Sequence, residues 1–246
     1  MRYLVISDIH ANLTAFLAVL REAGKPGVEY DLIWCLGDVV GYGPDPNECV
    51  ELLNALPHFS LAGNHDWVVI GKADGKAFHA AARHSAKWTH QVLNNKHRAY
   101  LASLPVTQIQ GDFTLAHASP RDPVWEYILS PAIASQNFGV FQTPYCLVGH
   151  THVPIHYRQT KNSASSQAVQ PVYSVPLSLA GGRQILNPGS VGQPRDKDTR
   201  AAYAILDDER QTWEFRRVPY DIESVQRRMR NAGLPEILII RLEQGW

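Results

Sequence analysis

Residues 3–10 of the chain read YLVISDIH. The segment from Tyr3 to Ser7 is short, apolar and rich in β-branched side chains, which predicts a strand buried on both faces. Asp8 and His10 follow at the point where that strand would end. Apolar residues then recur at helical spacing as far as Gly24, which predicts a helix that ends there. The segment therefore predicts a strand, a polar loop and a helix.

The same order of apolar run and polar cluster recurs along the chain. The clusters are Gly37-Asp38, Gly63-Asn64-His65-Asp66 and Gly149-His150-Thr151-His152, and a single His117 follows the apolar run at 113–116. Strands that alternate with helices predict an α/β sheet, in which ligands bind at the strand ends. We therefore expect these polar side chains to gather at one edge of a sheet. A single histidine after a strand is by itself more often a core residue than a ligand.

The residue types in these clusters indicate metal binding. Aspartates, an asparagine and histidines buried together would be unstable unless cations held them. Carboxylate, amide and imidazole donors suit Mn²⁺, Fe or Zn²⁺, whereas Mg²⁺ prefers oxygen ligands and water. Two such cations about 3.5–4 Å apart share a bridging anion, and one carboxylate can serve. The sequence thus predicts a two-metal hydrolytic site.

Length and charge restrict the domain organisation and the possible partners of the protein. We expect residues 1–246 to form a single domain, although two small domains would also fit this length. Lys plus Arg and Asp plus Glu both number 23, so net charge gives no argument for a nucleic-acid, membrane or acidic partner. No apolar run approaches the roughly 20 residues of a membrane span. The sequence does not indicate an oligomeric state.

The cysteines and the first residues suggest the compartment. Cys35, Cys49 and Cys146 lie in apolar segments without C-x-x-C spacing, which predicts buried thiols in a reducing compartment. The apolar start of the chain is too short for a signal peptide. We therefore expect a cytoplasmic protein.

Periodicity and turn residues predict the other elements. Further strands are expected at 31–36, 59–62, 106–109, 145–148, 184–186, 201–206 and 212–218, with a hairpin turn at Gly111-Asp112. Helices are expected after Asn12, Asp45 and Asp221 as caps, near Ile133, and from Lys76 to Leu104 with Phe78, Ala82, Trp88 and Val92 in the core. Thr160 to Gln170 is polar and predicts a mobile hairpin or loop, and the tail after Leu234 favours helix over strand.

The five motifs together resemble the calcineurin-like metallophosphoesterase superfamily, in particular its small prokaryotic phosphodiesterase-type members. Each motif alone is common, but here all five occur in the superfamily's order over about residues 1–153. The resemblance implies an α/β fold, a four-layer α-β-β-α sandwich of two mixed sheets flanked by helices.

The resemblance also implies a role for each motif residue. The first metal would be held by Asp8, His10 and His152, the second by Asn64, His117 and His150, and Asp38 would bridge both. The cofactors would be two divalent or mixed-valence ions of Mn, Fe or Zn, and a hydroxide between them would attack phosphorus in line. His65 would be the general acid that protonates the leaving group, and Asp66 would orient His65.

Departures from the superfamily's protein phosphatases bear on the substrate. Those enzymes carry an acidic residue and an arginine soon after the second motif, where this chain has Val39-Val40-Gly41, and they have glutamate where it has Asp66. We therefore expect a phosphodiesterase acting on a small phosphoester. A phosphomonoesterase or dinucleoside polyphosphate hydrolase is the alternative. A non-catalytic metal-binding scaffold ranks last, because scaffold members tend to lose the proton-donating histidine and His65 is present.

Some residues have two interpretations that the sequence leaves open. Asn64 and Arg195 are candidates for contacting substrate, although Arg195 also fits an ordinary exposed arginine. Asn187-Pro188-Gly189-Ser190 is a tight turn that could also lie near the substrate. The helical histidines, His79, His84, His90 and His97, fit a surface helix better than a lid over the site. Gly37, Gly63 and Gly149 are expected to let the chain turn sharply, with no Cβ atom in the way.

Overall fold

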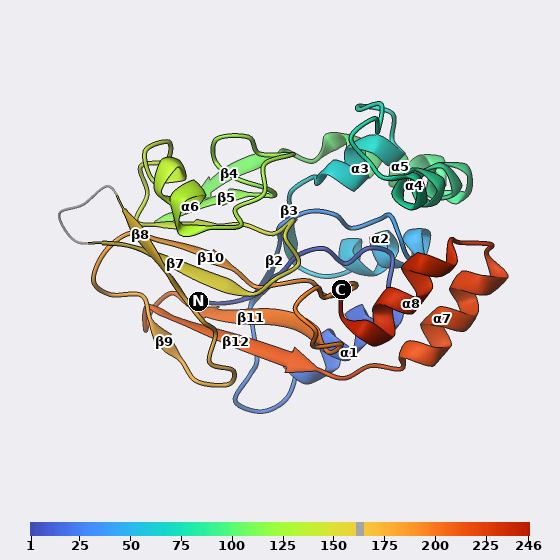
Figure 1. The fold of residues 1–246 in the computed structure, drawn as a ribbon. Helices are drawn as coiled ribbons and strands as arrows, with labels where there is room; N and C mark the ends of the chain where they lie inside the picture. Colours follow the sequence, from blue (N-terminus) through green and yellow to red (C-terminus); the bar gives the residue numbers. More distant parts are fainter. Residues whose placement is uncertain (161–164) are drawn as a thin grey trace.

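The computed structural model describes residues 1–160 and 165–246. Two six-stranded mixed sheets pack face to face (Figure 1). The first sheet has the order β3 (His58–Ser60), β2 (Leu32–Cys35), β1 (Arg2–Ile6), β11 (Ala201–Asp207), β12 (Thr212–Val218) and β9 (Leu177–Ser178). The second has the order β4 (Thr107–Gln110), β5 (Phe113–Ala116), β6 (Tyr145–Leu147), β10 (Gln184–Asn187), β7 (Ile155–Gln159) and β8 (Ser166–Val169).

Helices cover the outer faces of both sheets. They are α1 (Leu13–Ala23), α2 (Pro46–Asn54), α3 (Asn64–Val69), α4 (Ala80–Val92), α5 (Asn95–Ser103), α6 (Pro131–Asn137), α7 (Ile222–Asn231) and α8 (Glu236–Gln244). In Figure 1, α6 lies against the second sheet, whereas α1, α2, α7 and α8 lie toward the first. The predicted four-layer α-β-β-α sandwich is confirmed.

The layers follow from the alternation of side chains along each strand. Leu4 and Ile6 of β1 belong to the core between the first sheet and its helices, whereas Val5 belongs to the core between the sheets. Trp213 lies in that central core and is fully buried. A third core joins α6 to the outer face of the second sheet, where Ile185 packs. β1 is thus buried on both faces, as its sequence predicts.

Two of the three predicted helix caps are confirmed. The Asn12 side chain accepts a hydrogen bond from the Ala15 amide at 3.1 Å, and Asp221 caps α7 in the same way. Asp45 precedes α2 as expected, but its carboxylate does not cap that helix. It accepts instead from the Leu13 amide at 3.3 Å and pairs with Arg228 of α7 at 2.9 Å. Asp45 therefore ties α2 to α1 and α7.

The single helical region predicted from Lys76 to Leu104 is two helices. The chain leaves helical geometry at Leu93, and the Asn94 side chain accepts from the His97 amide at 2.8 Å to begin α5. Asparagine is a strong cap because its side chain replaces a missing helical partner. Val92, expected in the core, is 40% exposed at this break. Neither α3 nor the two-residue β9 was predicted.

The remaining predictions agree with the structure where it describes them. β7 and β8 pair antiparallel up to Gln159 and Ser166, so the polar stretch from Thr160 to Gln170 includes a hairpin partner, while residues 161–164 lie outside the described part. The β4–β5 hairpin and the helical tail α8 are confirmed. Among described residues, no helix is long and apolar enough to cross a membrane.

Candidate metal centre

The predicted site residues follow strands of both sheets. β1, β2 and β3 are parallel, and Asp8, Asp38 and Asn64 come after their carboxyl ends. In the second sheet β5 and β6 are parallel, and His117 and His150 follow them. All five side chains are buried. The strand ends of the two sheets therefore bring these polar side chains together at one buried site, as expected for an α/β protein.

One group of donors joins the loop after β1 to the loop after β6. The Nε2 atoms of His10 and His152 are 3.0 Å apart, and Asp8 Oδ1 lies 3.8 Å from the first and 3.3 Å from the second. Oδ1 of Asp8 is buried and has no hydrogen-bond partner. Three donors that converge on one point, one of them an unpaired carboxylate oxygen, fit a cation.

A second group lies beside the first. Nε2 of His117 is 3.4 Å from Asp38 Oδ2 and 3.2 Å from Asn64 Oδ1. Donor atoms of Asp38, His117 and His150 lie within 4.8 Å of one another. Asp38 Oδ2 is also 3.6 Å from Nε2 of His10, in the first group. The Asp38 carboxylate therefore stands between the two groups.

The backbone of the site is strained. Asp8, His10, Asp38, His150 and His152 all have positive φ, between 49° and 63°. Residues other than glycine rarely adopt this conformation, which costs on the order of 1–3 kcal/mol each and concentrates at functional sites. The rest of the fold must hold these side chains in place against that cost.

Glycines make room for the donors at close approaches. A Cβ atom at Gly63 would overlap Asp38 Oδ1, and one at Gly149 would overlap Ser7 Oγ. Neither glycine has a positive φ, so the reason for glycine is space and not a turn. Gly37 differs, because it has φ +103° and a Cβ there would also press on His117.

Burial leaves most of the imidazoles neutral. It lowers the pKa of His10 to about 4 and of His150 to about 3, and it lowers the pKa of His152 well below its ordinary value. A neutral imidazole keeps the lone pair that a metal requires. Burial also raises the pKa of Asp8 to about 7. The Asp8 carboxyl group resists ionisation in this interior, and a cation beside it would stabilise the ionised form.

Asp38 and His117 form a charged pair. Burial alone would raise the pKa of Asp38, but the neighbouring imidazoles, His117 foremost, hold it well below its ordinary value. Burial alone would lower the pKa of His117, but the Asp38 carboxylate raises it to about 9. A cation held by Asp38 would stabilise that carboxylate in the same way, and His117 would then bind the cation as a neutral imidazole.

Comparison with known proteins agrees with this geometry. Residues 1–154 match the family model described as calcineurin-like phosphoesterase. The chain belongs to this family. A metallophosphoesterase from Sphaerobacter thermophilus has a crystal structure with TM-score 0.90 and 48% identity, covering 100% of this chain and 99% of that one.

A further relative of the phosphoesterase, and a second solved structure with the same fold, extend over nearly the whole chain. An uncharacterized protein from Methanocaldococcus jannaschii is 38% identical over 98% of this chain and 97% of its own. The crystal structure of a hypothetical protein from Pyrococcus horikoshii OT3 has TM-score 0.82 and 22% identity, with coverage of 100% and 98%. The protein is therefore a phosphoester hydrolase by family, with His and Asp groups that could hold metal ions.

In this phosphoesterase His65 lies against the donor cluster. Its ring stacks on Phe78 with centroids 4.3 Å apart and meets the His10 ring edge-on at 4.9 Å. Nδ1 of His65 is buried without a hydrogen-bond partner. The orienting contact expected from Asp66 is not formed, because the Asp66 carboxylate accepts from the backbone amides of Val39, Val40 and Gly63. Asp66 therefore holds the loop after β2, and the aromatic rings hold His65.

Arg195 lies at the site and is half-buried. Its Nη2 donates to Gln193 Oε1 at 2.9 Å and to the Tyr42 hydroxyl at 3.3 Å. Its guanidinium lies 5.7 Å from the centre of the Tyr42 ring. The ordinary exposed arginine is therefore the wrong interpretation. Tyr42, whose ring lies 4.6 Å from that of His10, is a site residue that the sequence did not indicate.

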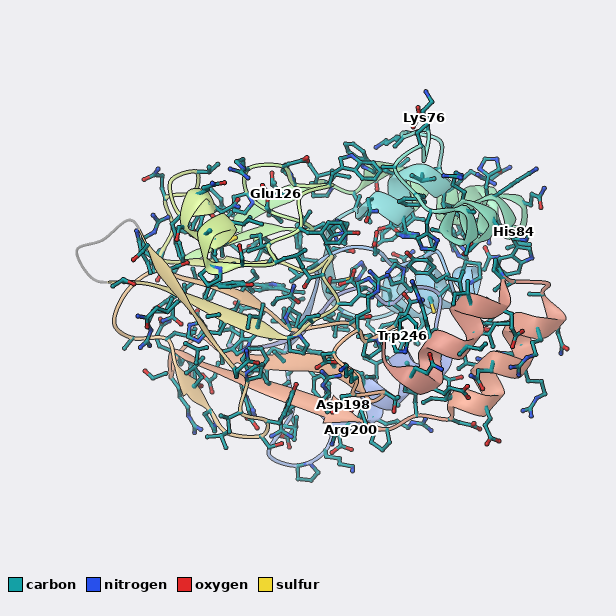
Figure 2. The ribbon with its side chains drawn as sticks, viewed as in Figure 1. Lys76, His84, Glu126, Asp198, Arg200 and Trp246 are labelled. Atoms are coloured by element: carbon teal, nitrogen blue, oxygen red, sulfur yellow. The ribbon has the colours of Figure 1, made fainter. Side chains whose placement is uncertain are left out.

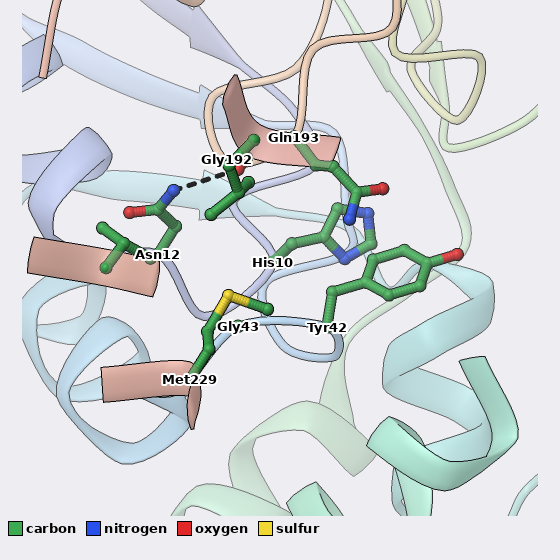
Figure 3. Close-up of a pocket in the computed structure, with 9 residues that line it drawn as sticks. His10, Asn12, Tyr42, Gly43, Gly192, Gln193 and Met229 are labelled. Carbon is green, nitrogen blue, oxygen red and sulfur yellow. Dashed lines mark hydrogen bonds between the residues drawn. The ribbon is translucent and has the colours of Figure 1, made fainter. Parts of the chain in front are cut away.

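The turn at 187–190 contacts the loops that carry the metal donors. The Asn187 side chain donates to the Gly149 carbonyl at 2.7 Å, and Ser190 Oγ donates to the Asp8 carbonyl at 2.9 Å. Asn12 reaches the same region, donating to the Gly192 carbonyl at 3.0 Å (Figure 3). These hydrogen bonds hold the strained loops after β1 and β6 in place, so the turn positions the metal donors without being one of them.

The helical histidines do not join the donor groups. His79, His84 and His90 are exposed, and Figure 2 shows His84 on α4 at the outside of the molecule. His97 is buried, and its Nδ1 lies 3.0 Å from Asn47 Oδ1. The surface interpretation therefore holds for the first three, while His97 links α5 to α2.

Proposed function

We propose that this phosphoesterase is a metal-dependent phosphodiesterase with two metal ions. The observation that carries the proposal is the shared Asp38 carboxylate, which lies between two groups of buried donors. The first ion would be held by Asp8, His10 and His152, the second by Asn64, His117 and His150, with Asp38 bridging. This mixture of oxygen and nitrogen donors suits Mn, Fe or Zn. Bound there, the ions would supply a nucleophile from solvent and neutralise charge on phosphorus.

His65 is proposed as the general acid. Donor atoms of His65, His10 and Asp38 lie within 4.8 Å of one another, so its ring can reach a group bound at the centre. Burial lowers the pKa of His65 well below its ordinary value. The negative charge of a bound phosphoester would favour the protonated ring, which then passes its proton to the leaving alkoxide. Phe78 holds the ring in that position.

A small phosphodiester is the proposed substrate class. The backbone after Asp38 runs through Val39 and Val40, so no arginine stands there to grip the third oxygen of a monoester. Arg195 remains as a cation at the site, and Asn64 contributes its amide. A diester has one charge fewer than a monoester and needs less neutralisation.

The test uses an activated diester. We expect bis-p-nitrophenyl phosphate to be hydrolysed when Mn²⁺ is added, and Asp38→Asn to reduce turnover by at least about a hundredfold, as the loss of a principal electrostatic group does. Wild-type protein with Mn²⁺ that turns the diester over no faster than Asp38→Asn would overturn the proposal. Parallel rates on monoesters and on dinucleoside polyphosphates would decide between the phosphodiesterase and the two related activities.

Two further features are proposed with this function. Residues 1–246 form one domain, which is supported by the hydrogen bond from the Lys197 amide to the Gly245 carbonyl at 2.7 Å. A cytoplasmic location is supported by the free, buried thiols of Cys35, Cys49 and Cys146.

A further inference from the structure

His156 of β7 is a buried histidine outside the metal donor groups. Its side chain is 1% exposed, and neither Nδ1 nor Nε2 has a hydrogen-bond partner among residues 1–160 and 165–246. Buried polar groups in folded proteins are nearly always hydrogen-bonded, because an unpaired one destabilises the folded state. The unpaired imidazole therefore indicates a partner from outside the chain.

The His156 ring lies between the two sheets. Its neighbours in β7, Ile155 and Tyr157, pack in the core that joins α6 to the second sheet. Because side chains alternate along a strand, His156 points to the opposite face. Leu186 of β10, which pairs with His156 across the sheet, belongs to the core between the sheets. The imidazole thus faces the interior of the sandwich.

A cavity of about 170 Å³ adjoins this ring at the edge strands of both sheets. β8 is the last strand of the second sheet and β9 the last strand of the first, and Figure 1 shows both at the same end of the molecule. Leu177 of β9 and Phe215 of β12 line the cavity from the first sheet, and His156 lines it from the second. The cavity therefore lies between the sheets.

The remaining lining of the cavity is mostly apolar and opens to solvent. Val169, Val172 and Val175 line it and are 40%, 64% and 52% exposed. Gln170, which also lines it, is exposed and polar. An apolar pocket with an unpaired polar group inside it is the usual composition of a small-molecule site.

Gln184 of β10 is a possible partner for His156 within the chain. It lies two residues from Leu186 on the same face, and its amide raises the pKa of His156 against the larger lowering by burial. No hydrogen bond joins the two side chains, however, and Gln184 Oε1 is itself buried without a partner. Gln184 Nε2 donates to the Leu179 carbonyl at 2.6 Å, which holds the amide in place. Gln184 therefore leaves the imidazole unpaired.

The size and chemistry of the cavity restrict its ligand. Apolar cavities of about 150 Å³ in proteins bind benzene, so this one admits a single ring. Burial, and then the charge of Arg158, lower the pKa of His156 to about 4. A neutral imidazole offers one N–H donor and one lone pair, and a hydroxyl group can pair with either.

We propose that this cavity binds a small apolar molecule that carries a hydroxyl group, such as a phenol, with His156 as its hydrogen-bond partner. The apolar part of the ligand packs against Leu177 and Phe215, and the hydroxyl pairs with the imidazole. The cavity shares no lining residue with the two donor groups of the metal centre, so its test is independent of turnover.

Calorimetric titration with two probes that differ by one hydroxyl group tests the site. 4-Methylphenol and toluene are titrated into wild type, His156→Leu and a matched control, His84→Leu, at the outside of α4 (Figure 2). One hydrogen bond should make 4-methylphenol bind about tenfold more tightly than toluene to wild type. His84→Leu should keep that preference, whereas His156→Leu should bind both probes alike. Chelation of metal should change neither affinity, which excludes binding of the phenol oxygen at the metal centre.

Three results would overturn the proposal. They are the absence of binding to wild type, equal affinity of wild type for the two probes, and a preference that survives His156→Leu. Sedimentation identifies one cause of absent binding, a dimer whose second copy covers the exposed valines. Thermal melting confirms that each variant is folded, and His156→Gln, which keeps a donor and an acceptor, should retain part of the preference.

Discussion

The charged pair of Asp38 and His117 predicts how the metal-free protein responds to pH. Folding raises the pKa of His117 from 6.5 to about 9. A group with a raised pKa in the folded state stabilises that state fully below its unfolded pKa and loses the effect as pH rises through its folded pKa. At about 1.36 kcal/mol per unit, the loss between pH 6.5 and 9.5 is on the order of 3 kcal/mol.

Urea unfolding after chelation, followed by tryptophan fluorescence, measures this loss. We expect the free energy of unfolding to fall with pH across that window in wild type and to fall less in His117→Asn. The variant keeps only the decrease near pH 9 that comes from Cys35, Cys49 and Cys146, because burial raises the pKa of these thiols and they ionise first in the unfolded chain. Asp8, with a folded pKa of about 7, adds little above neutral pH. Bound metal should remove the dependence that His117 contributes, because a metal ligand must be neutral. A slope that is the same in wild type and His117→Asn would refute the reasoning.

Further predictions concern catalysis and packing. His65→Ala should leave the metal content unchanged but slow hydrolysis of esters with basic leaving groups by about 10²–10⁴-fold. Esters with acidic leaving groups should be slowed less, because such groups leave without a proton. Equal losses across a leaving-group series would exclude the general-acid role. Gly63→Ala should lower stability by about 1–3 kcal/mol, since its Cβ would overlap Asp38; an unchanged urea midpoint would contradict this. Trp213→Ala should cost about 3–5 kcal/mol, because Trp213 is fully buried between the sheets, and a thermal melt unchanged from wild type would count against that packing.

The sequence predicted the donor cluster well because each donor follows a buried strand. Asp8, Asp38 and His150 are far apart in the chain, but strand ends of an α/β sheet bring such residues to one edge. The sharp turn predicted for the glycines beside them is found only at Gly37, which has a positive φ, whereas Gly63 and Gly149 leave space where a Cβ atom would overlap a neighbour. Which donors form each group came from the resemblance, and the structure brings the same residues together.

Features that depend on tertiary contacts could not be read from the chain. Adjacency suggested that Asp66 orients His65, yet three backbone amides bind the Asp66 carboxylate. β9 has two residues, too few to show a period of two. The break before α5 did have a signal, Asn94, which was not used.

The metal content of the purified protein tests the central claim most directly. Inductively coupled plasma mass spectrometry after reconstitution with Mn²⁺ and removal of free metal should find two ions per chain in wild type. Asp38→Asn should retain at most one, because the carboxylate shared by both donor groups is lost. Two ions in the variant, or none in a folded wild type, would contradict the claim that Asp38 joins two cations at this site.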